Sequence, residues 1–319
     1  MSHGPQLLVT GATGFVGQVL VAEALRRGLS IRAALRVMGA PMAGGLEPVI
    51  VGALDQAVDW RQAVAGVHTV IHLAGRAHAP RNQGAAALQA FQRINVEATA
   101  ALAQAAIEAG VRRLVYVSSV KAVGNATLPG QVLSDSSTPH PTDAYGQSKL
   151  AAEQTLAAIA ARGGMEWVVI RPPLVHGPGV KGHLARLTRW VDRGWPLPLA
   201  GLENRRSVVG VHNLVDALLC VAHHPAAAGQ RFFVRDDEDL STPMLVHRIA
   251  QAMDRPARLF AVPPMLSALA MRLPGSDVLR RLTESLQVDA SPLTRLTGWR
   301  ATVSVDEGMR RMVHATARD

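Results

Sequence analysis

Cysteine is nearly absent from this sequence of 319 residues, and long apolar runs are missing altogether. The single cysteine, Cys220, excludes a disulfide framework within the chain and a cysteine-rich zinc site, and we expect no metal. The longest apolar candidate, 259–271, contains two prolines, Pro263 and Pro264, and is shorter than the roughly 18 residues of a membrane-spanning helix. The N-terminus also has no basic, cleavable leader. We therefore expect a soluble, cytoplasmic protein without stable membrane insertion, in which 259–271 packs in the core or against a partner, with a membrane-surface helix as the alternative.

Lysine is also scarce. The 33 basic residues include only Lys121, Lys149 and Lys181, which leaves 30 arginines, and the formal net charge is +9. Such an excess is typical of proteins that bind nucleic acid, membranes or anionic small molecules. Because the arginines are scattered and no nucleic-acid-binding module is present, we expect no nucleic-acid partner. A compositional bias together with an anionic ligand such as a nucleotide accounts for the charge.

Short apolar runs alternate with segments of helical periodicity along the first half of the chain. The predicted strands cover 6–10, 30–36, 48–52, 68–74, 113–118 and 166–170, and the predicted helices cover 16–27, 88–109 and 144–162. Nearly continuous apolar strands indicate a parallel sheet with helices on both faces, which is the doubly wound α/β fold of Rossmann type.

Beyond Pro173 the composition changes. Prolines become frequent, helical patterns dominate, and strands are few; one of them is predicted over 231–234. We therefore divide the chain into a sheet domain, 1–172, and a smaller, mostly helical region, 173–319, and we allow part of 205–235 to return to the sheet.

Three spaced glycines lie where the first predicted strand meets the first predicted helix. The segment Thr10–Gly17 reads TGATGFVG. Gly11 permits a tight turn, Gly14 lets the backbone approach a pyrophosphate, and the glycine at 17 lets the helix pack closely on the strand. The helix start at Phe15 and Val16 offers unpaired N–H groups and a partial positive charge to the phosphates. The motif predicts that 1–172 binds NAD(P) and that 173–319 binds the substrate.

The end of the second predicted strand bears on the choice of dinucleotide. A carboxylate at this place would bind the ribose 2′-hydroxyl of NAD, whereas an arginine would pair with the 2′-phosphate of NADP. The strand ends in Arg36 with no acidic residue beside it, which favours NADP over NAD.

The segment Tyr145–Lys149 reads YGQSK and opens a predicted helix. Residues i and i+4 share a helix face, so the ammonium favours phenolate and is expected to lower the tyrosine pKa from about 10. A tyrosine tuned in this way is a general acid or base. Ser119 follows the strand predicted over 113–118, at the edge where open α/β sheets bind ligands, and is expected to hydrogen-bond the reacting oxygen.

The order and spacing of these motifs resemble the extended short-chain dehydrogenase/reductases, in particular the branch of nucleotide-sugar epimerases and dehydratases. The resemblance covers nearly the whole chain. The residues that carry it are Thr10–Gly17, His72–Ala74, Asn95, Ser118–Ser119, Tyr145–Lys149, Arg171–Gly179, Arg206–Val211 and Gly298–Trp299. The stretch 178–182, with the Arg-Arg-Ser that precedes Val208, is similar to bacterial UDP-4-keto-hexosamine reductases and epimerases of surface-polysaccharide pathways.

This resemblance implies roles for four residues in catalysis. Ser119 would polarise the sugar oxygen and Tyr145 would be the acid or base. Lys149 would bind the nicotinamide ribose and tune the tyrosine. Asn95 would support the lysine from below the active site.

The resemblance also implies binding residues and an assembly. Leu73 and Ala74 belong to the cofactor-binding motifs. Arg206 would bind the diphosphate of a UDP-linked substrate, and Lys181 is a weaker candidate for the same anion. Members of the family often form homodimers through two helices, which would be 88–109 and 146–162 in this chain.

Three functions remain open from the sequence. The first is 4-keto reduction of a UDP-hexosamine derivative, favoured by Arg36 and the intact Ser/Tyr/Lys set. The second is 4-epimerisation of a UDP-sugar with tightly bound NAD. The third is a non-catalytic NADP-binding protein, against which that intact set argues.

Two departures from the family pattern narrow the choice. Val120 and Lys121 stand where sugar dehydratases carry an Asp–Glu pair, so dehydration is not expected. Val123 stands where epimerases usually have tyrosine, which weakens a strict glucose 4-epimerase assignment.

Overall fold

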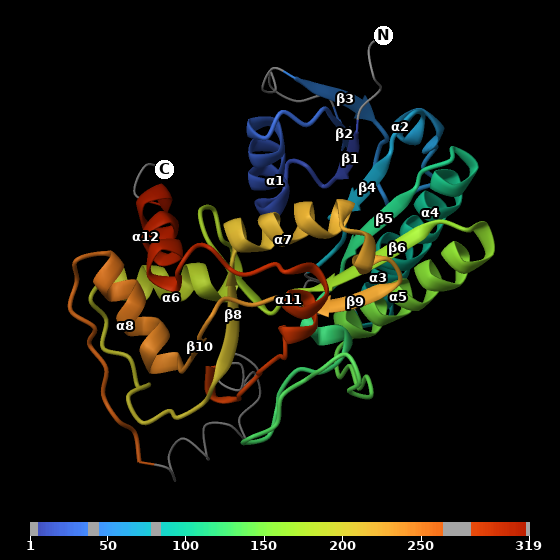
Figure 1. The fold of residues 1–319 in the computed structure, drawn as a ribbon. Helices are drawn as coiled ribbons and strands as arrows, with labels where there is room; N and C mark the ends of the chain where they lie inside the picture. The colour runs from blue at the N-terminus through green and yellow to red at the C-terminus, as the bar shows by residue number, and fades with distance from the viewer. Residues whose placement is uncertain (1–5, 38–44, 78–83, 264–281, 317–319) are drawn as a thin grey trace.

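The computed structural model describes residues 6–37, 45–77, 84–263 and 282–316. Its centre is a seven-stranded parallel sheet (Figure 1). From one edge to the other, the strands are β3 (Leu46–Ile50), β2 (Ile31–Leu35), β1 (Leu7–Thr10), β4 (Thr69–His72), β5 (Arg113–Val117), β6 (Glu166–Arg171) and β9 (Gln230–Phe233). β1, β2, β4 and β5 are buried along their whole length, as expected for a parallel sheet covered on both faces.

The strand order reverses direction between β1 and β4. The chain adds β2 and β3 on one side of β1, and then adds β4, β5 and β6 on the other side. Crossovers that leave a strand in opposite directions open a crevice at the carboxyl ends of β1 and β4. The Rossmann-type fold predicted from the sequence is therefore confirmed, and the crevice lies beside the glycine-rich turn.

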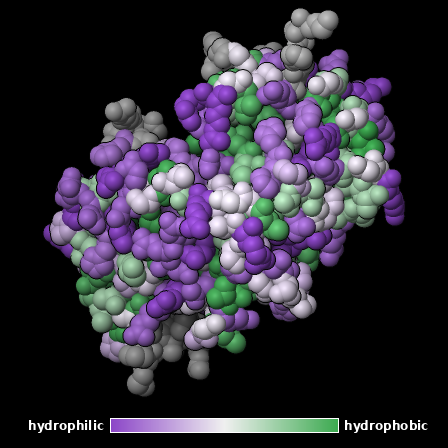
Figure 2. Space-filling model, viewed as in Figure 1, coloured by the Kyte–Doolittle hydropathy of each residue, from purple (hydrophilic) through white to green (hydrophobic). Residues whose placement is uncertain are grey.

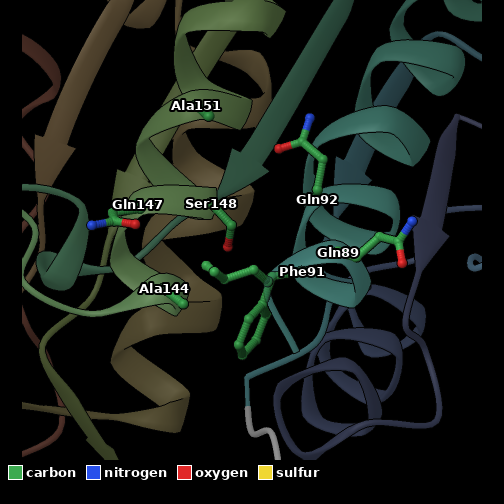
Figure 3. Close-up of a pocket in the computed structure, with 8 residues that line it drawn as sticks. Gln89, Phe91, Gln92, Ala144, Gln147, Ser148 and Ala151 are labelled. Carbon is green, nitrogen blue, oxygen red and sulfur yellow. The ribbon is translucent and has the colours of Figure 1, made fainter. Parts of the chain in front are cut away.

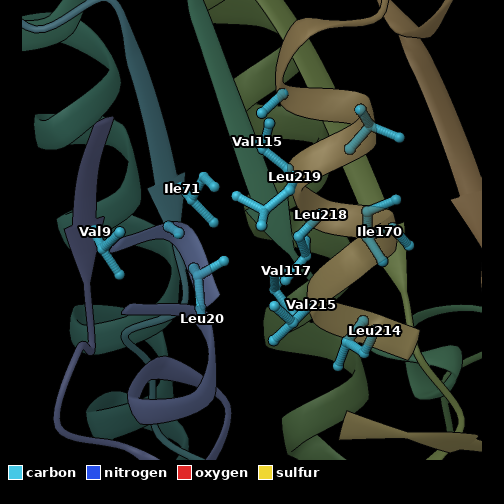
Figure 4. Close-up of a cluster of buried hydrophobic side chains, with 14 of the residues drawn as sticks. Val9, Leu20, Ile71, Val115, Val117, Ile170, Leu214, Val215, Leu218 and Leu219 are labelled. Atoms are coloured by element: carbon cyan, nitrogen blue, oxygen red, sulfur yellow. The ribbon is translucent and has the colours of Figure 1, made fainter. Parts of the chain in front are cut away.

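Helices cover both faces of the sheet (Figure 1). α1 (Phe15–Arg26) and α7 (Val211–His223) share one apolar cluster, in which residues of β1, β4, β5 and β6 meet the two helices (Figure 4). A second cluster joins the sheet to helices of the opposite face. These helices are α2 (Arg61–Val64), α4 (Ala98–Glu108) and α5 (Ala144–Gly163).

The long helix predicted over 88–109 is not one regular helix. It consists of α3 (Gly84–Phe91), a π-helical segment η1 (Gln92–Glu97) and α4. A π-helical segment carries an extra residue in its turn, a feature that often marks a functional site. Asn95 lies inside it.

The C-terminal region is less purely helical than predicted. It contains a second sheet of three strands, in the order β10 (Asp239–Leu240), β8 (Arg206–Gly210) and β7 (Leu174–His176). Three helices pack against this sheet around a third apolar cluster: α6 (Gly182–Asp192), α8 (Thr242–Ala252) and α12 (Val305–Thr316). The other helical elements of the region are η3 (Pro225–Ala227) and α11 (Ser291–Thr297).

The strand expected over 231–234 does not belong to that second sheet. As β9, it pairs in parallel with β6 at the edge of the main sheet, with Val168 opposite Gln230. α7, which precedes it, packs on the same main sheet. The chain therefore enters the C-terminal region, returns to the sheet over 211–233, and leaves again.

The viewed face of the molecule is mostly hydrophilic, with apolar side chains scattered in small groups (Figure 2). Within the described residues, no helix is long and apolar enough to cross a membrane. Of the apolar segment 259–271, the part over 264–271 lies outside the described residues. Phe260 is 47% exposed, and Leu259 forms a β-bridge with Leu197.

Candidate active site

The glycine-rich turn closes against the end of β4. Gly11 has φ +72°, and a Cβ on it would lie 2.8 Å from the backbone nitrogen of Ala74. A Cβ on Gly17 would lie 2.1 Å from the carbonyl oxygen of Gly11. Both glycines are thus required by close backbone approaches. Two hydrogen bonds join the ends of β1 and β4. The Leu73 N–H donates to Thr10 O at 3.2 Å, and the Ala74 N–H donates to the side-chain Oγ1 of Thr10 at 3.2 Å.

The N-terminus of α1 is open toward the crevice. Its N-cap is Gly14, no side chain caps the helix, and its first turn, which begins with Phe15 and Val16, contains no acidic residue. The first N–H groups of a helix have no partner within the helix and carry a partial positive charge. The turn therefore fits a pyrophosphate, which is the group that the sequence motif predicts at this place.

Arg36 directly follows β2 and is exposed to solvent. β2 lies beside β1 in the sheet, so Arg36 stands at the same carboxyl edge as the glycine turn. Its contact with a ribose phosphate stays a prediction.

Tyr145 and Ser119 come together from two different elements. Ser119 is the N-cap of the short helix η2 (Val120–Ala122) after β5, and its Oγ accepts a hydrogen bond from the Lys121 N–H at 3.2 Å. Tyr145 lies in the first turn of α5, and the Ser119 side chain lies near enough to its phenol to lower its pKa. The structure therefore brings the two predicted residues together at the end of β5, and their role as an acid–base centre stays a prediction.

The start of α5 is held by a capping carboxylate. Asp143 is the N-cap, and its Oδ1 accepts from the Gly146 N–H at 2.7 Å. Its Oδ2 accepts from Asn125 Nδ2 at 3.1 Å and forms an ion pair with Lys121. Burial raises the pKa of Asp143, but the Lys121 ammonium and the other donors outweigh it, so the pKa is lowered. The carboxylate thus fixes the first turn, and with it the backbone of Tyr145.

The expected lowering of the Tyr145 pKa is wrong for this structure. Burial raises the pKa of Tyr145 to about 12; the hydrogen bond with Ser119 opposes the rise, and the nearby Asp143 carboxylate adds to it. The physical reason is that desolvation of the phenolate outweighs the charge effects. The ammonium of Lys149 donates its hydrogen bond to Val117 O at 2.8 Å.

Lys149 is itself almost completely buried, with 5% of its surface exposed. Burial lowers the pKa of Lys149 to about 8, while the Glu153 carboxylate one turn further along α5 opposes this shift. The ammonium also lies over the ring of Tyr116, 4.5 Å from its centroid. A buried lysine with a pKa near the working range is typical of functional sites.

Asn95 links the chain after β4 to α5. Its Oδ1 accepts from the Arg76 N–H at 2.8 Å, and its Nδ2 donates to Arg76 O at 3.0 Å and to Ser148 Oγ at 2.9 Å. Gly75 separates it from the lysine: a Cβ on Gly75 would lie 3.0 Å from Asn95 Oδ1 and 3.5 Å from Lys149 Nζ. Asn95 therefore positions the backbone around Lys149, in line with the supporting role that the family implies.

The two predicted substrate-binding residues lie in the C-terminal region. Lys181 is the exposed N-cap of α6. Arg206 begins β8, and its Nη1 donates to Glu284 O at 2.7 Å. Their contact with a diphosphate stays a prediction.

The sequence analysis missed Glu153, which is completely buried and belongs to the same helix face as the predicted pair. It accepts hydrogen bonds from Arg171 Nε at 3.0 Å and Nη2 at 2.6 Å, and from Ser118 Oγ. Because Tyr145, Lys149 and Glu153 follow one another at intervals of four, the helical spacing could have revealed it.

A groove on the described surface lies between α3 and α5 (Figure 3). It measures about 370 Å³, and Phe91, Gln92, Gln147 and Ser148 are among the residues that line it. Neither Tyr145 nor Lys149 lines it. The groove is therefore a feature of the two helices rather than of the acid–base centre.

Three comparisons place the chain among known proteins. UDP-glucose 4-epimerase of Vibrio cholerae is 38% identical over 312 residues, which are 97% of this chain and 94% of that protein. A 3-beta-hydroxysteroid dehydrogenase of Mycolicibacterium neoaurum is 32% identical over 250 residues, covering 74% of this chain and 67% of that one. The structure of MoeE5 in complex with UDP-glucuronic acid and NAD has a TM-score of 0.78 at 28% identity, covering 98% of this chain and 99% of its own.

Residues 7–234 match the NAD dependent epimerase/dehydratase family. This range runs from the first residue of β1 to just beyond β9, so it contains the whole seven-stranded sheet together with the glycine turn and Ser119, Tyr145 and Lys149. The resemblance inferred from the motifs is confirmed: the chain belongs to the NAD-dependent epimerase/dehydratase family of extended short-chain dehydrogenase/reductases.

Proposed function

We propose that this protein is a UDP-sugar 4-epimerase that works with NAD. The observation that carries the proposal is the meeting of Ser119 and Tyr145 at the end of β5, where the serine side chain lowers the Tyr145 pKa, with the buried Lys149 one turn along α5. The same residues serve oxidation and reduction at a sugar carbon. The 38% identical relative from Vibrio cholerae, a UDP-glucose 4-epimerase, supports epimerisation as the outcome.

The glycine turn fits the cofactor that this reaction needs. Gly11, Gly14 and the first turn of α1 would hold the pyrophosphate, and Lys149 would hold the nicotinamide ribose. An acidic side chain or a side-chain cap at the N-terminus of α1 would compete with phosphate, and α1 has neither. The oxidised nicotinamide held there would supply a hydride acceptor for the sugar carbon and, before the transfer, a positive charge that would favour the phenolate of Tyr145.

The chain's own residues manage the proton. Tyr145 takes a proton from the sugar 4-hydroxyl and later returns it, while Ser119 donates a hydrogen bond to the same oxygen. Lys149 is buried and Tyr145 is half-buried, which limits the access of water to the exchange. Arg206 and Lys181 would bind the diphosphate of the substrate as cations.

The test is epimerisation without added cofactor. Purified protein is incubated with UDP-glucose and with UDP-N-acetylglucosamine, and the 4-epimers are quantified by NMR; retained NAD or NADP is identified by mass spectrometry. We expect turnover and retained NAD. Tyr145→Phe keeps the ring but removes the proton, so turnover should fall by about 10² to 10⁴-fold while NAD stays bound. Absence of turnover with any UDP-sugar would refute the proposal, and bound cofactor without turnover would favour a non-catalytic protein.

A second candidate is 4-keto reduction of a UDP-hexosamine derivative with NADPH. The exposed position of Arg36 after β2 favours it, because a guanidinium can pair with a ribose 2′-phosphate. In this reaction Tyr145 only gives a proton. Steady oxidation of NADPH by a UDP-4-keto sugar, with a preference for NADPH over NADH that Arg36→Ser abolishes, would identify the reductase.

We also propose that the protein forms a homodimer through α5 and the α3–η1–α4 helix. The groove between α3 and α5 gives these helices an uneven outer surface, and Leu88 on its rim is 52% exposed. Light scattering should give twice the monomer mass of 33.8 kDa, and Leu88→Glu should shift the protein to the monomer. A monomeric wild type would refute this assembly.

A further inference from the structure

Besides the nearby Glu153 carboxylate, two contacts stabilise the charged form of the buried Lys149 side chain. One is the hydrogen bond to Val117 O at 2.8 Å, and the other is the face of the Tyr116 ring, 4.5 Å away. Tyr116 lies in β5, next to Val117, and is 1% exposed. A cation over an aromatic face is attracted by the ring quadrupole, and the attraction is stronger where water is excluded.

The groups around Lys149 show how much of its charge depends on the ring. Glu153 acts on it from α5, Tyr116 from β5 and His72 from β4, while η1 contributes the neutral amide of Asn95, held off by Gly75. The Glu153 carboxylate is already bound by Arg171. The ring face therefore provides a stabilising contact that the other neighbours do not replace.

His72 also contacts the ring of Tyr116. Its imidazole is stacked on Tyr116 with centroids 5.6 Å apart and an interplanar angle of 30°. Burial, together with the Lys149 charge, lowers the pKa of His72 to about 3, so it is neutral and adds no second cation next to the ring. A neutral imidazole is able to stack here without competing with the lysine for the ring electrons.

A directed chain of hydrogen bonds holds this imidazole. Thr99 Oγ1 donates to Asn95 O at 2.7 Å, so it accepts the proton of His72 Nε2 at 3.0 Å. The other ring nitrogen, Nδ1, then accepts from Thr10 Oγ1 at 2.6 Å, and Thr10 Oγ1 accepts from the Ala74 N–H. This series of hydrogen bonds runs from the glycine-rich turn to the π-helical segment and fixes the orientation of the His72 ring.

We propose that Tyr116 is a positioning residue for Lys149: its ring face, stacked on neutral His72, holds the buried ammonium in place and in its charged form. The proposal rests on the proposed function, in which the charged lysine would hold the cofactor ribose. The Tyr116 hydroxyl is not part of it, because that hydroxyl lies near Thr99 but makes no hydrogen bond of good geometry with a described residue.

The test compares two matched substitutions. Tyr116→Phe keeps the aromatic ring, whereas Tyr116→Leu removes it. A third protein carries pentafluorophenylalanine at position 116, which keeps the shape of the ring but reverses its quadrupole. This third protein replaces the leucine variant in the test if that variant does not fold. The ionisation of Lys149 is followed by NMR of isotope-labelled lysine. The chain has only three lysines, so Lys121→Arg and Lys181→Arg assign the signals.

We expect the Lys149 pKa to fall by about one unit in the leucine and fluorinated proteins and to stay unchanged in Tyr116→Phe. The alkaline limb of the turnover profile should shift by the same amount and be restored by phenylalanine. An unchanged Lys149 pKa in the leucine and fluorinated proteins would overturn the proposal. A shifted pKa in a protein whose wild type turns over no UDP-sugar would refute the proposed function and leave the positioning of Lys149 intact.

Discussion

Replacement of Glu153 by glutamine tests the charge network beneath the active site. Glu153 is 0% exposed, and its two oxygens accept two hydrogen bonds from Arg171, which is 3% exposed, and one from Ser118. Arg231 Nε lies 3.6 Å from the same carboxylate. Glutamine has almost the same shape, but it carries no charge and offers an N–H group where an oxygen now accepts.

The magnitude follows from what remains buried after the change. Glu153→Gln leaves the Arg171 guanidinium without a counter-charge, and removal of one partner of a buried ion pair costs about 3–5 kcal/mol of the free energy of unfolding. The exposed Glu108, which accepts one hydrogen bond from Gln104 at 3.1 Å, is the matched control. Glu108→Gln should change the free energy of unfolding by less than about 0.5 kcal/mol.

Urea unfolding followed by circular dichroism measures both variants. A third variant, with Glu153→Leu and Arg171→Met together, leaves no uncompensated charge between these two positions and should recover most of the loss. Because the Glu153 carboxylate raises the Lys149 pKa, Glu153→Gln should also lower that pKa below about 8. A loss of less than about 1 kcal/mol in Glu153→Gln, or a double variant less stable than the single one, would refute the reasoning.

Three further outcomes follow from the site. Gly17→Ala places a Cβ 2.1 Å from Gly11 O, so the glycine-rich turn must move, and the dinucleotide affinity measured by calorimetry should fall at least about tenfold. The control Gly201→Ala, at a position with open space around it, should leave that affinity unchanged. Ser119→Ala removes the hydrogen bond that lowers the Tyr145 pKa, so kcat should fall by about 10²-fold with KM little changed; an unaltered kcat would exclude Ser119 from the site. His72 has a folded pKa of about 3 against 6.5 when unfolded, so the unfolded chain binds the extra proton and stability falls as pH drops from 6.5 toward 3. Relative to His72→Gln, the slope of unfolding free energy against pH between 4 and 6 should be steeper by roughly 1 kcal/mol per pH unit, and equal slopes would contradict a buried neutral imidazole.

Local patterns were sufficient for the sheet and the cofactor turn. The apolar strand runs, the glycines at 11, 14 and 17, and the spacing of Tyr145 and Lys149 each fit within one short window of sequence. Each reflects a constraint of the local backbone: a buried strand needs apolar neighbours, a tight turn needs glycine, and residues four apart share a helix face. These constraints made the fold class, the family and the acid–base pair predictable.

Features that depend on distant partners were not predictable. The strands β7, β8 and β10 are two to five residues long and exist because they pair with one another, each pairing joining residues more than 30 positions apart in the chain. The π-helical turn around Asn95 leaves the apolar periodicity of 88–109 almost unchanged, so the sequence pattern indicated one regular helix. Helical spacing could have placed Glu153 on the face of Tyr145 and Lys149, but only the fold shows that Arg171 binds it.

The sequence by itself determined which groups we propose for the chemistry, because a phenol, an amine and a hydroxyl are properties of residue types and of their spacing along the chain. Only the tertiary structure decided how those groups ionise. Burial raises the pKa of Tyr145 and lowers that of Lys149, and Tyr116 and His72 reach the lysine from separate strands. Desolvation and through-space contact depend on the packing of the whole molecule, so no window of sequence contains them.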